Sequence, residues 1–278
     1  MIIFKKADLL SGYLSQLKEQ KKTIGFVPTM GALHQGHFAL INAAKKEKHF
    51  VVCSIFINPT QFNNPEDLKH YPVTIVKDIQ GLVEAQCNVL FLPDIKEIYP
   101  DNYKKKYYRL GKLETILEGE YRPGHFQGVC QVMDRLLQIV QPDTLYLGQK
   151  DYQQCMVITK LLQLLEKKQV QIEIVPTVRE EDGLAMSSRN LRLNEEQRKK
   201  ATTLYKALNF IKSNQRKYPI TTLEERAKQQ LINNGFTVDY VHIADRSSLK
   251  KATSKNKHPV ALVAASLDGI RLIDNLLL

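Results

Sequence analysis

The sequence lacks the features of several large protein classes. It has only four cysteines, Cys53, Cys87, Cys130 and Cys155, which are far apart and form no Cys-x-x-Cys pair. Each lies among apolar residues, so we predict buried thiols rather than disulfides or zinc ligands. No apolar run is long enough to cross a bilayer, and we expect no membrane partner. Residues 1–6 do not follow the basic, apolar and small-residue order of a signal peptide, so we expect a cytoplasmic protein.

Common nucleotide and hydrolase motifs are also absent. The sequence contains no GxxxxGK[ST] loop, no GxGxxG after a predicted strand, no zinc-ligand spacing and no GxSxG nucleophile elbow. Its 278 residues, 43% hydrophobic and 25% charged, are typical of a globular protein with one large domain or two ordinary ones. Any nucleotide site must therefore be of a kind other than a P-loop.

The net charge of +11 could indicate a nucleic-acid partner, but its distribution argues against one. From residue 198 onward, Lys and Arg number 15 and Asp and Glu number 6. This excess is spread over predicted helical faces and a loop that contains Lys250, Lys251, Lys255 and Lys257. Few aromatic residues are interspersed among these basic residues. We therefore expect a solvated basic surface and no nucleic-acid partner.

The stretch 25–37 combines a strand, a turn and a helix. Residues 23–27 are apolar and partly β-branched, which predicts a buried strand, and Pro28 is expected to end it. A turn with two glycines and two histidines follows. Apolar residues then recur at helical spacing as far as the basic cluster at 45–48, which suits a helix C-terminus.

The two histidines of this turn suggest an anion site. His34 and His37 are three residues apart, so they would lie on one face of a helical turn. A helix N-terminus attracts phosphate, and Gly31 and Gly36 remove side chains where a ligand would come close. We predict two imidazoles directed at one anion. A histidine at a helix start is also often a cap or a surface residue, and this alternative stays open.

Strands and helices alternate as far as residue 176, which predicts an α/β fold with a doubly wound, mostly parallel sheet. Further strands are predicted at 50–57, 88–92, 144–147 and 170–175, and helices at 73–86, 127–140 and 152–165. Polar residues follow the strands, as Asn58 and Gln61 do after the second, and in such sheets ligands bind beyond these strand ends. Residues 94–112 are predicted to be an excursion at the sheet edge, and 118–126 a loop in which His125 orders the chain.

A smaller α+β domain is predicted from residue 177 to 278, after a first domain of residues 1–176. A polar loop at 177–190 opens it. Asn194 is expected to cap a helix that runs to about residue 212, and Thr222 to cap a second helix. A strand at 236–244 and a hairpin at 260–277 with an Asp-Gly turn complete the domain.

Four motifs in order resemble the pantoate–β-alanine ligase family of the cytidylyltransferase-like superfamily, which is related to class I aminoacyl-tRNA synthetases. They are the stretches 28–37, 58–62, 148–154 and 182–190. Residues 34–37 correspond to the HIGH motif of that superfamily, and residues 186–189 to its KMSKS-like loop. The match runs over nearly the whole chain, and four motifs at these spacings are highly specific.

The resemblance implies a Rossmann-like first domain that binds ATP and pantoate, and ATP-dependent joining of (R)-pantoate to β-alanine through a pantoyl adenylate, with release of AMP and pyrophosphate. It also implies Mg²⁺ with ATP and a homodimer, and we assign no metal-binding residue. His37 is the implied proton donor, with His34 and Lys150 as further catalytic residues. The implied substrate residues are Gln61 for pantoate and β-alanine and Gln154 for pantoate. The implied ATP-binding residues are Met30, Gly31, Ala32, Leu33, His34, Gln35, Gly36, His37, Gly148, Gln149, Lys150, Asp151, Val178, Met186, Ser187, Ser188 and Arg189.

One position departs from the family pattern, and two other functions remain as alternatives. Gln149 stands where the family often has Glu, between the implied contacts, and we expect little effect. The nearest alternative is a nucleotidyltransferase that adenylylates a phosphate group, which would share the histidine turn but would not need a carboxylic-acid pocket. The other is an RNA-binding or tRNA-charging protein, against which Arg189 stands where KMSKS enzymes end in Lys-Ser.

Overall fold

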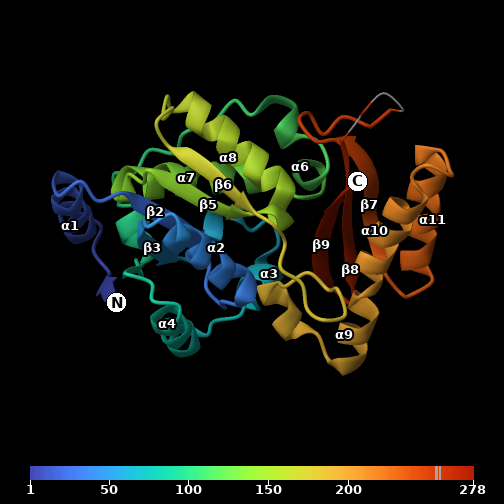
Figure 1. Ribbon diagram of the computed structural model, residues 1–278, viewed down its shortest axis with the longest axis horizontal. Helices are drawn as coiled ribbons and strands as arrows, with labels where there is room; N and C mark the ends of the chain where they lie inside the picture. Colours follow the sequence, from blue (N-terminus) through green and yellow to red (C-terminus); the bar gives the residue numbers. More distant parts are fainter. Residues whose placement is uncertain (254–255, 257) are drawn as a thin grey trace. The chain divides into compact units, whose positions relative to one another are not determined.

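The computed structural model describes residues 1–253, 256 and 258–278 (Figure 1). Lys255 and Lys257 of the predicted basic loop lie outside the described residues. The chain divides into two compact units, which we call the N-terminal unit (residues 1–149 and 154–176) and the C-terminal unit (residues 150–153 and 177–278). None of the helices in the described ranges combines the length and the apolar content needed to cross a bilayer.

The N-terminal unit contains a six-stranded sheet with the order β1-β4-β3-β2-β5-β6, and every neighbouring pair is parallel. Helices pack on both of its faces, which confirms the predicted doubly wound α/β fold. The strands are β1 (Ile2–Phe4), β2 (Ile24–Thr29), β3 (Phe50–Ile55), β4 (Val89–Phe91), β5 (Thr144–Gly148) and β6 (Gln171–Val175). The helices are α1 (Ala7–Glu19), α2 (Gln35–Lys46), α3 (Pro65–Lys69), α4 (Ile75–Glu84), α5 (Ile95–Ile98), α6 (Glu118–Tyr121), α7 (His125–Val140) and α8 (Tyr152–Leu164). The 3₁₀ turns are η1 (Pro59–Gln61), η2 (Gly111–Glu114) and η3 (Gln149–Asp151).

Alternation along the strands divides the core of the N-terminal unit into two layers. Phe26 of β2 belongs to the layer that buries apolar residues of α1, α7 and α8. The next residue, Val27, belongs to the layer beneath α2 and α4. Because successive strand residues point to opposite faces, an unbroken apolar strand is buried on both sides, as a parallel sheet requires.

The strand order reverses between β2 and β5. From β2 the chain continues through β3 to β4 on one side, whereas β5 and β6 lie on the other. In open α/β sheets, ligands bind outside the carboxyl ends of the strands at such a reversal. The histidine turn directly follows β2, so the topology places it at this position.

Pro28 does not end its strand, which corrects the prediction. β2 continues to Thr29, and Pro28 is in register with Ser54 of β3. The Ile24 carbonyl accepts a hydrogen bond from Asp143 N, on the side of the strand that faces β5. Alternate residues of a strand direct their backbone groups to the same neighbour, so the backbone nitrogen of Pro28 also faces the β5 side. Pairing with β5 stops at Phe26, so the N–H that proline lacks would have had no partner there.

Several elements and one core segment were not predicted. β1 and α1 precede the first predicted strand, and the short β1 pairs with β4 at the sheet edge. Residues 94–112 are more than an excursion at the edge, because Tyr108 and Leu110 are buried in the layer that contains α7. Residues 118–126 are likewise not one loop, since α6 and the start of α7 occupy most of them.

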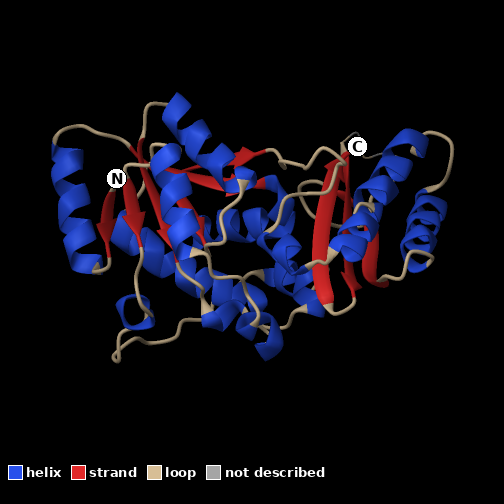
Figure 2. Ribbon diagram, turned by 90° about the horizontal axis from the view of Figure 1, so that it is seen from below, coloured by secondary structure: helices blue, strands red, loops and turns tan. Residues whose placement is uncertain are grey.

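The C-terminal unit has a three-stranded antiparallel sheet with the order β7-β8-β9, covered by α10 and α11 (Figures 1 and 2). This confirms the predicted small α+β architecture and the Asp268-Gly269 hairpin. Its strands are β7 (Thr237–Asp245), β8 (Pro259–Leu267) and β9 (Ile270–Leu277). Its helices are α9 (Glu195–Ala201), α10 (Thr203–Asn214) and α11 (Ile220–Ile232), preceded by the 3₁₀ turn η4 (Ser188–Arg192).

Two helix boundaries in this unit differ from prediction. Asn194 caps a helix as expected, but that helix ends at Ala201 and a second one starts at Thr203. The hydroxyl of Thr202 donates to the Lys199 carbonyl at 2.8 Å, a local bond of the kind that competes with the helical ladder. Thr222 is not a cap, because α11 already starts after Pro219, whose carbonyl accepts from Leu223 N.

Gly128→Ala tests the close approach of η1 to α7. A Cβ at Gly128 would lie 2.2 Å from the Thr60 carbonyl oxygen and 2.6 Å from Gln61 Cα, so backbone would have to move. We expect a loss of about 1–3 kcal/mol in the free energy of unfolding, measured in urea. Gly12→Ala in α1 is the control, because nothing lies within 4 Å of its added Cβ, and it should be neutral or stabilising. Equal effects of the two variants would contradict the packing.

Candidate functional site

The histidine turn is a reciprocal helix cap. His34 is the N-cap of α2, and its Nδ1 accepts a hydrogen bond from Gly36 N at 3.1 Å. The Nδ1 of His37 accepts from His34 N at 3.3 Å. The two ring centroids are 4.1 Å apart. The two imidazoles therefore lie together on one turn as predicted, and the alternative of a helix cap is also correct, whereas the anion stays a prediction.

These hydrogen bonds determine where the two neutral rings carry their protons. A backbone N–H can only donate, so Nδ1 of His34 and of His37 must each be unprotonated. The proton of each neutral ring is then on Nε2, which becomes a donor. Two N–H donors beside a helix N-terminus make an arrangement suited to phosphate oxygens.

Asp78 holds the turn that precedes the histidines. Its Oδ2 accepts from Ala32 N at 2.9 Å and its Oδ1 from Leu33 N at 2.8 Å, and Thr74 Oγ1 donates to Oδ1 at 2.9 Å. Asp78 is 1% exposed. Gly31 and Ala32 have positive φ angles of +83° and +50°. This conformation is unfavourable for alanine, so the hydrogen bond from Ala32 N to Asp78 helps to hold it.

Sequence reasoning did not single out Asp78, although a signal was present. In the predicted helix 73–86, Asp78 shares one helical face with Ile75, Ile79 and Leu82, which follow the core spacing. A carboxylate on an apolar face is costly unless it is hydrogen-bonded. A buried partner could therefore have been expected, but the pattern could not identify the backbone of Ala32 and Leu33 as that partner.

Gln61 is held in one orientation by its neighbours. Asn58 Nδ2 donates to Gln61 Oε1 at 3.1 Å and also to the Gly128 carbonyl at 3.1 Å. The Gln61 Nε2 group lies 3.1 Å from Met30 Sδ. The predicted substrate residue Gln61 is thus brought to the predicted ATP-binding residue Met30, with its amide N–H groups on that side.

Two further side chains support η1. His125 is the first residue of α7, and its Nδ1 donates to the Gln61 carbonyl at 2.8 Å, so it orders η1 and not the loop in which it was predicted to act. The Tyr99 hydroxyl donates to Asn58 Oδ1 at 2.9 Å. Burial raises the pKa of Tyr99 to about 12, so the phenol keeps the proton that this bond needs.

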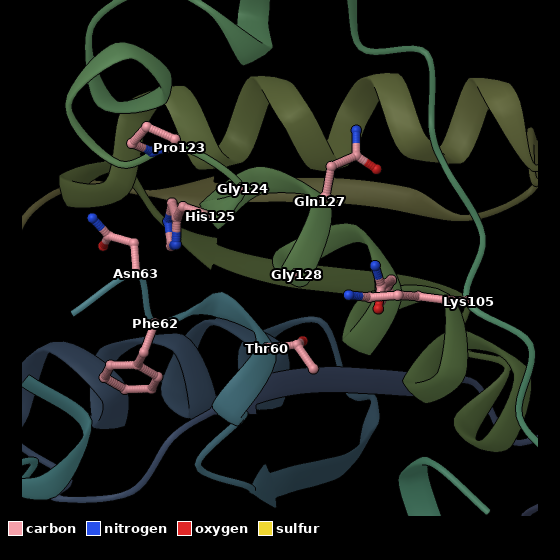
Figure 3. Close-up of a pocket in the computed structure, with 10 residues that line it drawn as sticks. Thr60, Phe62, Asn63, Lys105, Pro123, Gly124, His125, Gln127 and Gly128 are labelled. Carbon is pink, nitrogen blue, oxygen red and sulfur yellow. The ribbon is translucent and has the colours of Figure 1, made fainter. Parts of the chain in front are cut away.

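A cavity of about 190 Å³ lies between η1 and the start of α7 (Figure 3). Thr60, Phe62 and Asn63 line one side of it, and residues of α7 line the other. Gln131 also lines it, is 3% exposed, and has no hydrogen-bond partner for Oε1 among the described residues.

The other predicted site residues of the N-terminal unit lie at the end of β5 or follow it along the chain. Gly148 is the last residue of this strand, and Gln149 starts η3. Gln154 lies in the first turn of α8 and is half-buried.

The other predicted ATP-binding residues belong to the C-terminal unit. Lys150 and Asp151 lie in η3, where their charged groups are 3.7 Å apart. Val178 starts a short hairpin, whose Arg179–Ala185 bridge and Met186 N to Val178 O bond of 3.0 Å bring Val178 beside Met186. Ser187 caps η4 by accepting from Arg189 N at 3.3 Å, and Ser188 is buried.

Among the described residues, the cysteines and the metal-ligating side chains form no cluster. All four cysteines are buried and reduced, as predicted. Burial raises the pKa of Cys87 to about 11 and of Cys130 to about 12, so neither is a ready nucleophile. Among the described residues, no three His, Cys, Asp or Glu side chains are grouped so that they could hold a metal ion.

Comparison with known proteins identifies the family. A family model described as pantoate-beta-alanine ligase matches residues 2–277. The chain belongs to the pantoate–β-alanine ligase family. The pantothenate synthetase of Cytophaga hutchinsonii is 41% identical over 285 residues, which cover 100% of this chain and 99% of that protein.

Two solved structures of the ligase family are similar along the whole chain. That of pantothenate synthetase from Thermus thermophilus has 39% identity and a TM-score of 0.93, and covers 99% of both chains. That of pantoate–β-alanine ligase from Francisella tularensis has 38% identity and a TM-score of 0.85, and covers 100% of this chain and 97% of that one. The Francisella protein is in complex with beta-gamma ATP and β-alanine.

Asp78→Asn tests the support of the histidine turn in this ligase. The asparagine amide keeps one acceptor oxygen, but its NH₂ group must face the backbone N–H of Ala32 or Leu33. That buried backbone N–H is then left without an acceptor. We expect a loss of about 2–4 kcal/mol in the free energy of unfolding in urea. Thr74→Val removes only the hydroxyl bond and is the control, with an expected loss of about 1 kcal/mol. A loss for Asp78→Asn no larger than that of the control would show that the carboxylate is dispensable.

Gln131→Met tests the unpartnered carbonyl oxygen in the cavity. Methionine has a similar shape and no polar atom to desolvate, so this variant should be neutral or more stable by up to about 1 kcal/mol. Gln127 is the matched control on the same helix, since its amide bonds to the Tyr108 backbone and to Glu114 Oε1. Gln127→Met should be clearly destabilising in the same thermal unfolding series. An equal loss of stability in the two variants would contradict the conclusion that the Gln131 carbonyl oxygen has no partner.

Proposed function

We propose that this protein is an AMP-forming ligase that condenses (R)-pantoate with β-alanine, with ATP as co-substrate. The observation that carries the proposal is the reciprocal cap of His34 and His37 at the start of α2, which presents two N–H donors at the carboxyl end of β2. Membership of the family indicates that the anion bound there is ATP. It also indicates that the acid is pantoate and the amine is β-alanine.

In the first step, a carboxylate oxygen of pantoate attacks the α-phosphorus of ATP. A P–O bond forms, the bond to the bridging oxygen breaks, and pyrophosphate leaves. The carboxylate is ionised at neutral pH, so no base is required. The chain contributes positioning and charge neutralisation, with Nε2–H of His34 and His37 and the Lys150 ammonium as donors. The Nε2–H of His37 donates a hydrogen bond to the leaving pyrophosphate.

In the second step, the neutral amine of β-alanine attacks the carbonyl carbon of the pantoyl adenylate. A C–N bond forms, the bond between the carbonyl carbon and the AMP oxygen breaks, and the proton lost by the amine passes to solvent. No covalent intermediate with the protein is involved. Gln61 binds pantoate and β-alanine, and Gln154 binds pantoate. Asn58 supports this role by turning the Gln61 NH₂ group toward Met30.

The proposed ATP-binding residues come from both units. Those of the N-terminal unit are Met30 to His37, Gly148 and Gln149, and those of the C-terminal unit are Lys150, Asp151, Val178, Met186, Ser187, Ser188 and Arg189. The proposed domains are residues 1–176, which bind ATP and pantoate, and residues 177–278, with the KMSKS-like loop at the start. The serine hydroxyls and the arginine fork suit phosphate oxygens.

Mg²⁺ is proposed to accompany ATP. Because Mg²⁺ usually binds through substrate phosphates and few protein carboxylates, a chain whose described residues form no metal-ligand cluster fits an ion carried by the nucleotide. When bound, it neutralises charge on the phosphates. We further propose a cytoplasmic homodimer that binds neither nucleic acid nor membrane.

Pyrophosphate–ATP exchange tests the function. Labelled pyrophosphate should enter ATP only when pantoate is present, and neither β-alanine, tRNA nor a nucleotide phosphate should replace it. Exchange driven by a phosphate compound would instead support a nucleotidyltransferase, and exchange driven by an amino acid with tRNA a charging enzyme.

His34→Asn and Lys150→Ala test the catalytic residues in the same assay. Asparagine is a preferred N-cap, so His34→Asn keeps the cap and removes only the imidazole. Each variant should lower the single-turnover rate of adenylate formation by roughly 10²-fold, the effect of losing one preorganised donor. His70→Ala and Lys46→Ala, at exposed positions, are the controls. Single-turnover rates near that of the unmodified protein would remove these residues from the mechanism.

A further inference from the structure

The C-terminal unit contains a buried ion pair beside its proposed ATP-binding segments. Arg179 Nη1 lies 2.7 Å from Asp274 Oδ2, and Nη2 lies 2.9 Å from Oδ1, so the two groups pair as parallel forks. The same guanidinium donates to the carbonyls of Gly183 at 3.0 Å and Asn275 at 3.1 Å. It also lies 4.2 Å from the ring centroid of Tyr205.

This ion pair is costly to bury. The Asp274 side chain is 2% exposed and the Arg179 side chain 16%. Burial raises the pKa of Asp274, against the opposing effects of the Arg179 and Lys150 charges. The cost of desolvating the two charges offsets their attraction, so a buried ion pair contributes little to the free energy of unfolding. The geometry that the pair imposes on its neighbours therefore explains its presence better than stability does.

Arg179 belongs to the hairpin that leads into the KMSKS-like loop. Its backbone bridges to Ala185, one residue before the proposed ATP-binding run 186–189. Gly183 at the hairpin turn has φ of +90°, and a Cβ there would lie 2.0 Å from the Tyr205 ring. The guanidinium therefore binds the turn of its own hairpin at Gly183 and ties it to β9.

The next residue of β9 reaches the second segment. Asn275 Nδ2 donates to the Lys150 carbonyl at 2.9 Å, and Asn275 is 1% exposed. Tyr152 OH also donates to the Arg246 carbonyl at 3.0 Å. Residues 150–153 are thus held by the C-terminal unit, although they follow β5 in the chain.

We propose that Arg179, Asp274 and Asn275 are positioning residues for ATP. Adjacent residues of β9 hold the hairpin of the KMSKS-like loop and the Lys150 backbone in one rigid body, so that the cations of both segments have fixed mutual positions before the nucleotide binds. This inference rests on the proposed ATP-binding role of Lys150 and residues 186–189. Preorganisation of this kind lowers the ordering cost of binding the triphosphate.

Three variants each remove a different contact of Arg179, Asp274 or Asn275. Arg179→Lys keeps the charge but cannot form the fork. Asp274→Asn keeps the shape and removes the charge. Asn275→Leu keeps much of the volume and removes the donor to Lys150. The ion pair of Arg271 with Asp239, 2.7 Å apart in the same sheet, supplies the matched control as Arg271→Gln.

The test compares nucleotide binding with stability. For each variant we would measure the dissociation constant of α,β-methylene ATP by calorimetry, the KM values for ATP and pantoate in pyrophosphate exchange, and the thermal unfolding midpoint. Arg179→Lys and Asn275→Leu should raise the dissociation constant and the KM for ATP by about 10-fold or more and leave the KM for pantoate within twofold. Arg271→Gln should lower the midpoint without changing either constant for ATP.

The outcomes distinguish positioning from a purely structural role. If Arg179→Lys and Asn275→Leu lower the midpoint as the control does, with unchanged ATP constants, the proposal is wrong. If Asp274→Asn does not fold, the other two variants still decide. Absence of pantoate-dependent exchange in the unmodified protein would refute the proposed ligase function, whereas tight analogue binding that these variants weaken would still support the positioning role.

Discussion

Satisfaction of the backbone donors at the start of α2 is the constraint on which the site depends. The turn before a helix and the first residues of the helix leave backbone N–H groups without helical partners. Here side chains accept them, since Asp78 binds Ala32 and Leu33, His34 binds Gly36, and His37 binds His34. The same bonds place the ring protons on Nε2, so completing the cap also prepares the two donors. Structure and chemistry therefore share one set of hydrogen bonds.

The part of the site that is proposed to bind pantoate depends on a close approach of two backbone segments. η1 can lie against α7 only because Gly128 has no side chain there. That contact lets Asn58 bond at once to the Gly128 carbonyl and to Gln61 Oε1, which decides the orientation of the glutamine amide. His125 completes the support through the Gln61 carbonyl. A neutral amide in one fixed orientation suits the recognition of a small polar acid.

In the C-terminal unit, β9 has the corresponding role. Two neighbouring buried residues, Asp274 and Asn275, hold a hairpin and a turn that are far apart in the sequence. Both sites thus follow the same principle. Residues that could contact the nucleotide sit on turns, and buried polar side chains of regular elements hold those turns in place.

Local patterns in the sequence were sufficient for the fold class, five of the six parallel strands, the Asp268-Gly269 hairpin and the family. Apolar runs, turn residues and four short motifs act over a few residues, so they can be read directly. The cap formed by His34 and His37 was also accessible, because both partners lie within one turn. β1 was not, since three residues form a strand there only through pairing with β4.

Tertiary structure decided which distant residues meet. Asp78 lies 46 residues from Ala32, and Arg179 lies 95 residues from Asp274. Pro28 stays within its strand because pairing with β5 ends before it. Each of these outcomes depends on strand order and register, which no local pattern specifies. The sequence by itself determined the residue types and the turns of the site, whereas their buried supports followed only from packing, because a buried polar group takes whichever partner the assembled core brings to it.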